Sequence, residues 1–170
     1  KPQIALEQIR WACESGLPRG VALMDAAYGR DARLRAGMTE LDVPYAVGIV
    51  PTILMWAPGS GPRRMDKPMN NTGRRDEPEL VSAKKVALGL PKQAWRTVTW
   101  REGSADQLSS RFARVRVRVG YNKLIPEKLS PEWLMIEWTE GAAEPTKYWL
   151  RKLPEYLSFT QLVDPAKLRW

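Results

Sequence analysis

The stretch Val21-Ala22-Leu23-Met24-Asp25 decides the fold, because a continuous apolar run ends abruptly in a carboxylate. An apolar run bounded by a turn predicts a strand buried on both faces, as in the parallel part of an α/β sheet. Ligands of such sheets gather at the carboxyl ends of the strands. We therefore predict Asp25 to be a metal-binding carboxylate at an active-site edge. The alternative is an Asx turn that closes the strand and caps the next segment, and position alone favours neither.

The segments around this strand predict a parallel α/β unit. Residues 4–15 and 30–41 have the apolar spacing of helices, and residues 44–50 form a second mostly apolar strand. Helix, strand, helix and strand follow one another within the first fifty residues.

The second half of the chain predicts antiparallel β structure. A loop rich in proline, glycine and arginine covers residues 58–78, and Ser82 is placed to cap a short helix. Four strands are predicted after it, at residues 95–101, 111–119, 132–139 and 147–153. Asp164 followed by Pro165 predicts the start of a last helix. The fold class is therefore α/β, a helix-strand-helix-strand core with an antiparallel β-rich insertion.

Composition narrows the chemistry that this chain can perform. Histidine is absent, which excludes Ser-His-Asp catalysis and histidine-bound zinc, and the single Cys13 excludes an internal disulfide. Carboxylates that hold magnesium are the leading option that remains. A net charge of +8, from 27 basic and 19 acidic residues, favours a polyanionic partner. No apolar stretch is long enough for a membrane helix and no signal peptide is evident, so we expect no membrane partner.

Alternating arginines between residues 111 and 119 are a candidate nucleic-acid surface. Period two places Arg114, Arg116 and Arg118 on one face of a strand and valines on the other. Arginines on one face then stand ~6.6 Å apart, a spacing that suits contact with successive phosphates. The alternative is a solvated face whose arginines pair with cross-strand Glu137 or protect a sheet edge.

A second candidate contact with nucleic acid lies near the end of the first predicted β-strand of the second half. Trp100 and Arg101 could stack on an unpaired base and hold its phosphate. A hairpin with a cross-strand aromatic pair is the more usual structure for such a sequence.

The sequence resembles the insertion-sequence transposases of the DDE superfamily endonuclease type. Matching stretches lie at residues 19–29, 95–103, 109–114, 132–138, 144–150 and 166–170. This resemblance implies an RNase H-like core that is interrupted by a β-rich insertion. It places residues 1–50 in the catalytic core, residues 51–157 in a loop plus the insertion, and residues 158–170 at the start of the final core helix.

The resemblance also implies roles for particular residues. Asp25 corresponds to the second aspartate of the Asp-Asp-Glu triad, with the first aspartate expected upstream of Lys1 and the glutamate beyond Trp170. Arg169 corresponds to an arginine that helps hold the DNA end. A tyrosine found three residues earlier in some relatives is Ala166 here, so its contact does not carry over.

The implied activity is DNA strand cleavage and transfer with Mg²⁺ (or Mn²⁺), which only the intact site would bind. The implied partners are transposon ends and target DNA, with a homodimer of the full-length protein in the bacterial cytoplasm, associated with the nucleoid. A chain that lacks two of the three acids is expected to be inactive alone and prone to self-association through an open strand edge. Two alternatives remain: a non-catalytic DNA-binding module or decayed transposase remnant, and a plain α/β domain with a solvated basic face.

Overall fold

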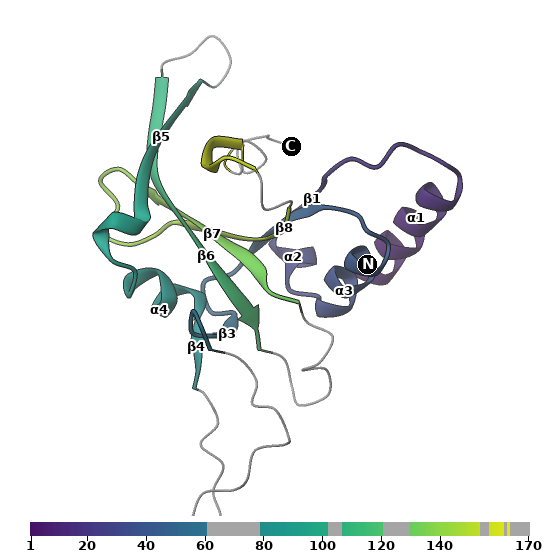
Figure 1. Ribbon diagram of the computed structural model, residues 1–170, viewed down its shortest axis with the longest axis horizontal. Coiled ribbons are helices and arrows are strands. Elements are labelled where there is room, and N and C mark those ends of the chain that lie inside the picture. Colours follow the sequence, from purple (N-terminus) through teal and green to yellow (C-terminus); the bar gives the residue numbers. More distant parts are fainter. Residues whose placement is uncertain (61–78, 102–106, 121–129, 154–156, 162, 164–170) are drawn as a thin grey trace, which may run out of the picture.

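Eight strands form one mixed sheet in the described part of the chain. The computed structural model describes residues 1–60, 79–101, 107–120, 130–153, 157–161 and 163, with the side chains of Trp100, Arg101 and Gln107 left out. The strands are β1 (Ala22–Met24), β2 (Tyr45–Ile49), β3 (Leu54–Trp56), β4 (Leu80–Ser82), β5 (Trp95–Arg101), β6 (Gln107–Val119), β7 (Glu132–Thr139) and β8 (Lys147–Lys152). Their order is β1-β2-β8-β7-β6-β3-β4, and β5 pairs with β6 (Figure 1).

The helices cover one face of this sheet and extend beyond its β1 end. They are α1 (Pro2–Glu14), α2 (Ala26–Gly29), α3 (Ala32–Glu40), α4 (Ala83–Leu88) and a 3₁₀ turn η1 (Lys92–Ala94). The predicted helices in the first half and after Ser82 are confirmed, and the Ser82 hydroxyl accepts a hydrogen bond from the Lys85 amide at 3.1 Å. The single turn α2 and the short strands β3 and β4 were not predicted, because three or four residues carry too little periodicity to be recognised.

One strand joins the two kinds of structure that the sequence predicts. β2 pairs in parallel with β1 on one side and antiparallel with β8 on the other, where Gly48 lies opposite Trp149. The four predicted strands of the second half are confirmed as β5, β6, β7 and β8. The α/β unit and the antiparallel strands therefore share one continuous sheet.

The prediction that the first strand is buried on both faces is wrong. All three residues of β1 are half-buried, and Val21 before them is 44 % exposed. The cause is position, because β1 is the outermost strand of the sheet among the described residues and pairs there with β2 alone. An apolar run by itself does not distinguish a central strand from an outer one.

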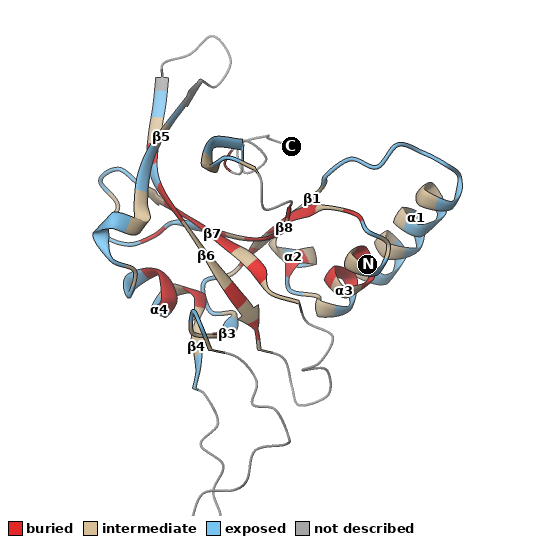
Figure 2. Ribbon diagram, in the orientation of Figure 1, coloured by how far each residue is buried: buried red, intermediate tan, exposed pale blue. Residues whose placement is uncertain are grey.

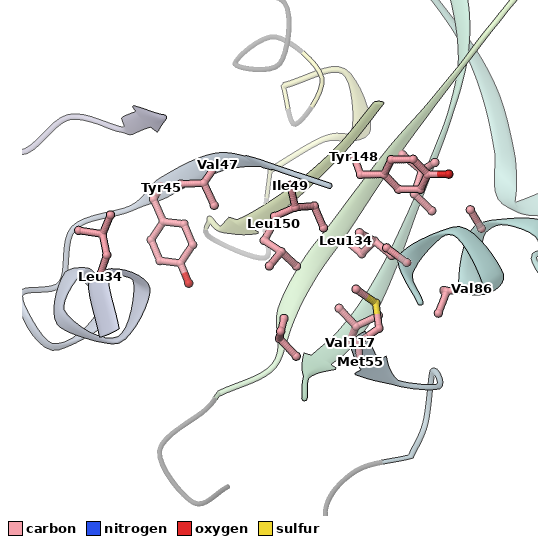
Figure 3. Close-up of a cluster of buried hydrophobic side chains, with 14 of the residues drawn as sticks. Leu34, Tyr45, Val47, Ile49, Met55, Val86, Val117, Leu134, Tyr148 and Leu150 are labelled. Carbon is pink, nitrogen blue, oxygen red and sulfur yellow. The ribbon is translucent and has the colours of Figure 1, made fainter. Parts of the chain in front are cut away.

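The main core lies between the sheet and the helices α2, α3 and α4. Figure 3 shows Leu34 of α3 beside Tyr45 at one end of this cluster and Val86 of α4 at the other, with side chains of β2, β7 and β8 between them. Buried residues concentrate in the middle of β6 and β7 and on α3 and α4, whereas α1 has none and lies outside α3 (Figure 2).

A smaller apolar cluster covers the opposite face of the sheet. Phe112 and Met135 point to this face and pack with Leu153, Val163 and Phe159. Residues 159–161 and 163 are helical. This helical segment begins after Ser158, and the helix start predicted at Asp164 lies outside the described residues.

The start of this helix is fixed by a reciprocal pair of hydrogen bonds. The Ser158 hydroxyl accepts from the Gln161 amide at 3.2 Å, and the Gln161 side chain accepts from the Ser158 amide at 2.9 Å. This is a capping box, and its Ser-x-x-Gln spacing is a sequence signature of a helix start at Ser158.

Two glycines let α2 lie directly against β2. A Cβ atom added to Gly29 would stand 1.9 Å from the Gly48 carbonyl oxygen, well inside van der Waals contact. A Cβ atom on Gly48 would stand 3.1 Å from the Ala26 amide nitrogen. The backbone of α2 therefore packs on the backbone of β2, with no room for a side chain between them.

A buried polar network connects the helices to the antiparallel strands. The Nε atom of Arg35 donates to Oε1 of Glu132 at 2.9 Å, and the Tyr45 hydroxyl donates to the same oxygen at 2.7 Å. Arg35 and Tyr45 are each 1 % exposed and Glu132 is 3 % exposed. Arg35 also donates through Nη1 to the Gly29 carbonyl oxygen at 2.5 Å. The network thus joins α3, β2 and β7 to the last residue of α2.

Burial keeps the Tyr45 hydroxyl in its protonated, donating form. Desolvation raises its pKa far above the ordinary value of 10.0, and the negative charge of Glu132 raises this pKa further. The folded protein therefore retains this proton at pH values where the unfolded chain loses it.

The contact between Gly29 and Gly48 predicts a strong effect of a single methyl group. Gly29→Ala should lower the free energy of unfolding by about 1–3 kcal/mol or more, because two backbones must separate to admit the Cβ atom. The control is Gly20→Ala, where no atom lies within 4 Å of the added Cβ, and its effect should stay within about 0.5 kcal/mol. Urea denaturation of both variants measures the difference, and equal midpoints would contradict the packing described.

The raised pKa of Tyr45 predicts a loss of stability in alkali. Above pH ~10 the unfolded state releases the tyrosine proton and the folded state keeps it, so the free energy of unfolding falls by up to ~1.4 kcal/mol per pH unit. Tyr45→Phe lacks this contribution. The stability advantage of the wild type over Tyr45→Phe should be constant below pH ~10 and shrink above it. Denaturation curves of the two proteins from pH 8 to 11 test this, and parallel pH profiles would refute it.

Candidate functional site

Asp25 lies at the carboxyl end of β1 and is the N-cap of α2. Its Oδ1 atom accepts hydrogen bonds from the amides of Ala27 at 2.8 Å and Tyr28 at 3.3 Å. The cap considered as the alternative from the sequence is therefore present. Both bonds use Oδ1, and no described residue donates to Oδ2. Because the side chain is exposed, Oδ2 is open to a ligand from solvent.

The exposed carboxylate fits one ligand position of a divalent metal site. Mg²⁺ needs only one or two protein carboxylates, with waters and phosphate oxygens as its other ligands. Within the described ranges, no three acidic or cysteine side chains come close enough to hold an ion together. Asp31, the next acid along the chain, caps α3 through a 2.9 Å hydrogen bond from the Leu34 amide. Among the described residues, Asp25 therefore belongs to no cluster of three or more such side chains.

The arginines of β6 lie on one face, as the alternation predicts. Val117 and Val119 are buried on the core face, whereas Arg114, Arg116 and Arg118 are half-buried on the other. The guanidinium carbons of Arg114 and Arg116 lie 4.9 and 4.8 Å from the centre of the Trp133 ring. The face is therefore an ordered array of cations against an aromatic ring, rather than a freely solvated one.

The helical segment after Ser158 rests on part of this face. The Phe159 ring lies 5.3 Å from the guanidinium carbon of Arg96 on β5 and 5.7 Å from that of Arg114. Arg114 thus contacts an aromatic ring from β7 and one from the helical segment. Arg116 contacts the Trp133 ring as well.

The remaining predicted DNA contacts lie largely outside the described side chains. In β5 the backbones of Trp100 and Arg101 pair with Leu108 and Gln107, which confirms the hairpin, while their side chains are not described. Arg169 also lies outside the described residues. The aromatic pair of this region is instead Trp95 with Trp138, whose rings meet edge to face at 5.3 Å.

The ion pair whose arginine binds the last carbonyl group of α2 is not predicted by any pattern in the sequence. Arg35 and Glu132 are 97 positions apart, and neither has a neighbour in sequence that reveals the other. Their burial is known only from the structure and does not follow from the residues beside them in the sequence.

None of the described helices is both long enough and apolar enough to cross a membrane.

Comparison with known proteins identifies the family. A model of the DDE superfamily endonuclease family matches residues 1–107, more than half of the 170 residues. The matched part runs from α1 through β5 and contains Asp25, Gly29, Arg35 and Tyr45. Searches of curated proteins and of solved structures found no significant match. The chain therefore belongs to the DDE superfamily endonuclease family, whose members have an RNase H-like fold and generally use divalent metal ions.

Proposed function

We propose that this chain is part of a transposase that cleaves DNA and joins the cut strand to target DNA. The observation that carries the proposal is Asp25, an exposed carboxylate at the carboxyl end of β1 with Oδ2 open to solvent. It lies within the residues that match the endonuclease family. Resemblance to insertion-sequence transposases supports the finer assignment to transposition.

Asp25 serves as a metal ligand in this proposal. The amides of Ala27 and Tyr28 hold Oδ1, which fixes the orientation of the carboxylate and leaves Oδ2 available. A divalent ion bound there, Mg²⁺ or Mn²⁺, supplies Lewis-acid stabilisation of the charge that develops on phosphate oxygens. No group of three or more acidic or cysteine side chains completes such a site within the described residues.

The arginine face of β6 binds the DNA backbone in this proposal. Guanidinium groups held against Trp133 lose less conformational freedom on binding a phosphate than free side chains do. The net charge of +8 supports the same partner through long-range attraction. We assign further DNA contacts to Arg118, which follows Arg116 on this face, and to the side chains of Trp100, Arg101 and Arg169. A homodimer in the bacterial cytoplasm is the proposed state of the full-length protein.

A second candidate function is DNA binding without catalysis. The two hydrogen bonds that Asp25 accepts favour it, because they account for an aspartate at the start of α2 without any metal. The two functions differ in what replacement of Asp25 does.

Asp25→Asn should abolish cleavage in the full-length protein while DNA binding is retained. Asparagine caps a helix as well as aspartate does, so α2 keeps its cap, but the ligand charge is lost. We expect cleavage to fall by at least about 100-fold, since even residues that only support metal ligands cost 10–100-fold. Cleavage of a labelled duplex with Mg²⁺ and a gel-shift titration measure the two properties.

The matched control is Asp31→Asn, which also replaces an aspartate N-cap whose Oδ1 accepts a backbone amide. This variant should cleave at the wild-type rate. If the two variants behave alike, Asp25 is only a cap and the non-catalytic function is favoured.

The salt dependence of duplex binding tests the arginine face. Arg116→Gln should lower the slope of log affinity against log salt by about 1, whereas Arg116→Lys should preserve the slope. Arg19 is an exposed residue outside β6 whose guanidinium group lies 3.7 Å from the Asp42 carboxylate, and Arg19→Gln is the control variant. An unchanged slope for Arg116→Gln would remove Arg116 from the DNA-binding surface.

A further inference from the structure

The buried ion pair between α3 and β7 reaches the turn that carries Asp25. Arg35 donates to Glu132 through Nε at 2.9 Å and to the Gly29 carbonyl oxygen through Nη1 at 2.5 Å. Gly29 is the last residue of α2, and Asp25 is the cap at the other end of the same turn. We propose that Arg35 and Glu132 are positioning residues for Asp25, so that a strand of the inserted sheet sets the geometry of the metal-binding carboxylate.

The turn α2 depends on such external support. A helix of four residues forms too few hydrogen bonds to offset the cost of nucleation and is not stable by itself. Its internal bond runs from the Gly29 amide to the Asp25 carbonyl oxygen at 3.0 Å. The contact with Gly48 supports one side of the turn, and Arg35 binds its final carbonyl group. Any shift of Gly29 is therefore transmitted through one turn to Asp25.

The direction of the Arg35 bond distinguishes positioning from simple stabilisation. Apolar side chains of similar volume often stabilise a core as well as a buried ion pair does. They cannot donate to the Gly29 carbonyl oxygen, whereas the planar guanidinium group binds this oxygen and Glu132 at once. Tyr45 belongs to the same network through its hydrogen bond to Glu132, and it also interacts with the Thr39 side chain. Its replacement therefore tests the network without removing the bond from Arg35 to Gly29.

The test replaces the network with apolar side chains in the full-length protein. The triple variant Arg35→Met, Tyr45→Phe and Glu132→Leu removes both charges of the buried ion pair together, so neither charge is left without the other. It also removes the donor to the Gly29 carbonyl oxygen. Tyr45→Phe alone is the control, since it removes the bond to Glu132 and keeps the bond from Arg35 to Gly29.

Two readouts report on α2 rather than on overall stability. Hydrogen exchange at the amides of Ala27, Tyr28 and Gly29 should be at least about tenfold faster in the triple variant, with exchange across the β7–β8 pairing unchanged. The Mg²⁺ concentration for half-maximal cleavage should rise about 10–100-fold, while the KM for DNA stays the same. Tyr45→Phe should match the wild type in both readouts.

The proposal is overturned if the triple variant has wild-type exchange in α2 and a wild-type Mg²⁺ requirement. If the triple variant does not fold, Arg35→Lys gives the same decision, because lysine keeps the charge beside Glu132 but lacks the fork that reaches Gly29 as well. Faster exchange in α2 then supports the proposal and unchanged exchange refutes it.

This inference rests on the proposed function of Asp25. Normal cleavage by Asp25→Asn would remove that function, whereas the exchange measurement tests the mechanical link by itself.

Discussion

One buried ion pair, between Arg35 of α3 and Glu132 of β7, joins the two halves of this molecule. Its atoms lie 2.9 Å apart, and both side chains are almost fully removed from water. Burying these charges is costly unless each is paired and hydrogen-bonded, and here each side chain satisfies the other. The same network joins β2 to β7 through the Tyr45 hydroxyl, and α3 to α2 through the Gly29 carbonyl oxygen. Four elements therefore meet at one buried polar centre.

The elements that could be predicted are those whose signal lies in neighbouring residues. The arginine and valine alternation of β6 and the Ser82 cap of α4 are two such local signals. An acid that follows an apolar run predicts that Asp25 lies at a strand end, where it is either a metal ligand or a helix cap, and the cap is present. The burial of β1 was overestimated, because an outer and a central strand have the same composition. The partners Arg35 and Glu132 could not be predicted, since their meeting depends on a fold that brings together residues 97 positions apart.

The basic face shows how aromatic residues change what arginines can do. Six of the eight tryptophans lie in the second half of the sequence. Trp133 lies against two guanidinium groups on the face opposite the main core, and the Trp138 ring lies 4.8 Å from the guanidinium carbon of Arg111. A guanidinium group against a ring retains its N–H donors at the edge of the plane. These rings therefore order the arginines without consuming their capacity to bind anions.

The pairing of β2 with β1 on one side and with β8 on the other has a mechanical consequence. A hinge between domains needs a segment that few contacts cross, and here a continuous ladder of backbone hydrogen bonds runs from β1 through β8 and β7 to β6. The antiparallel strands cannot rotate relative to the α/β unit without breaking these backbone hydrogen bonds. A ligand bound on the β6 face would consequently lie at a fixed distance from the carboxyl end of β1, because the sheet between them is continuous.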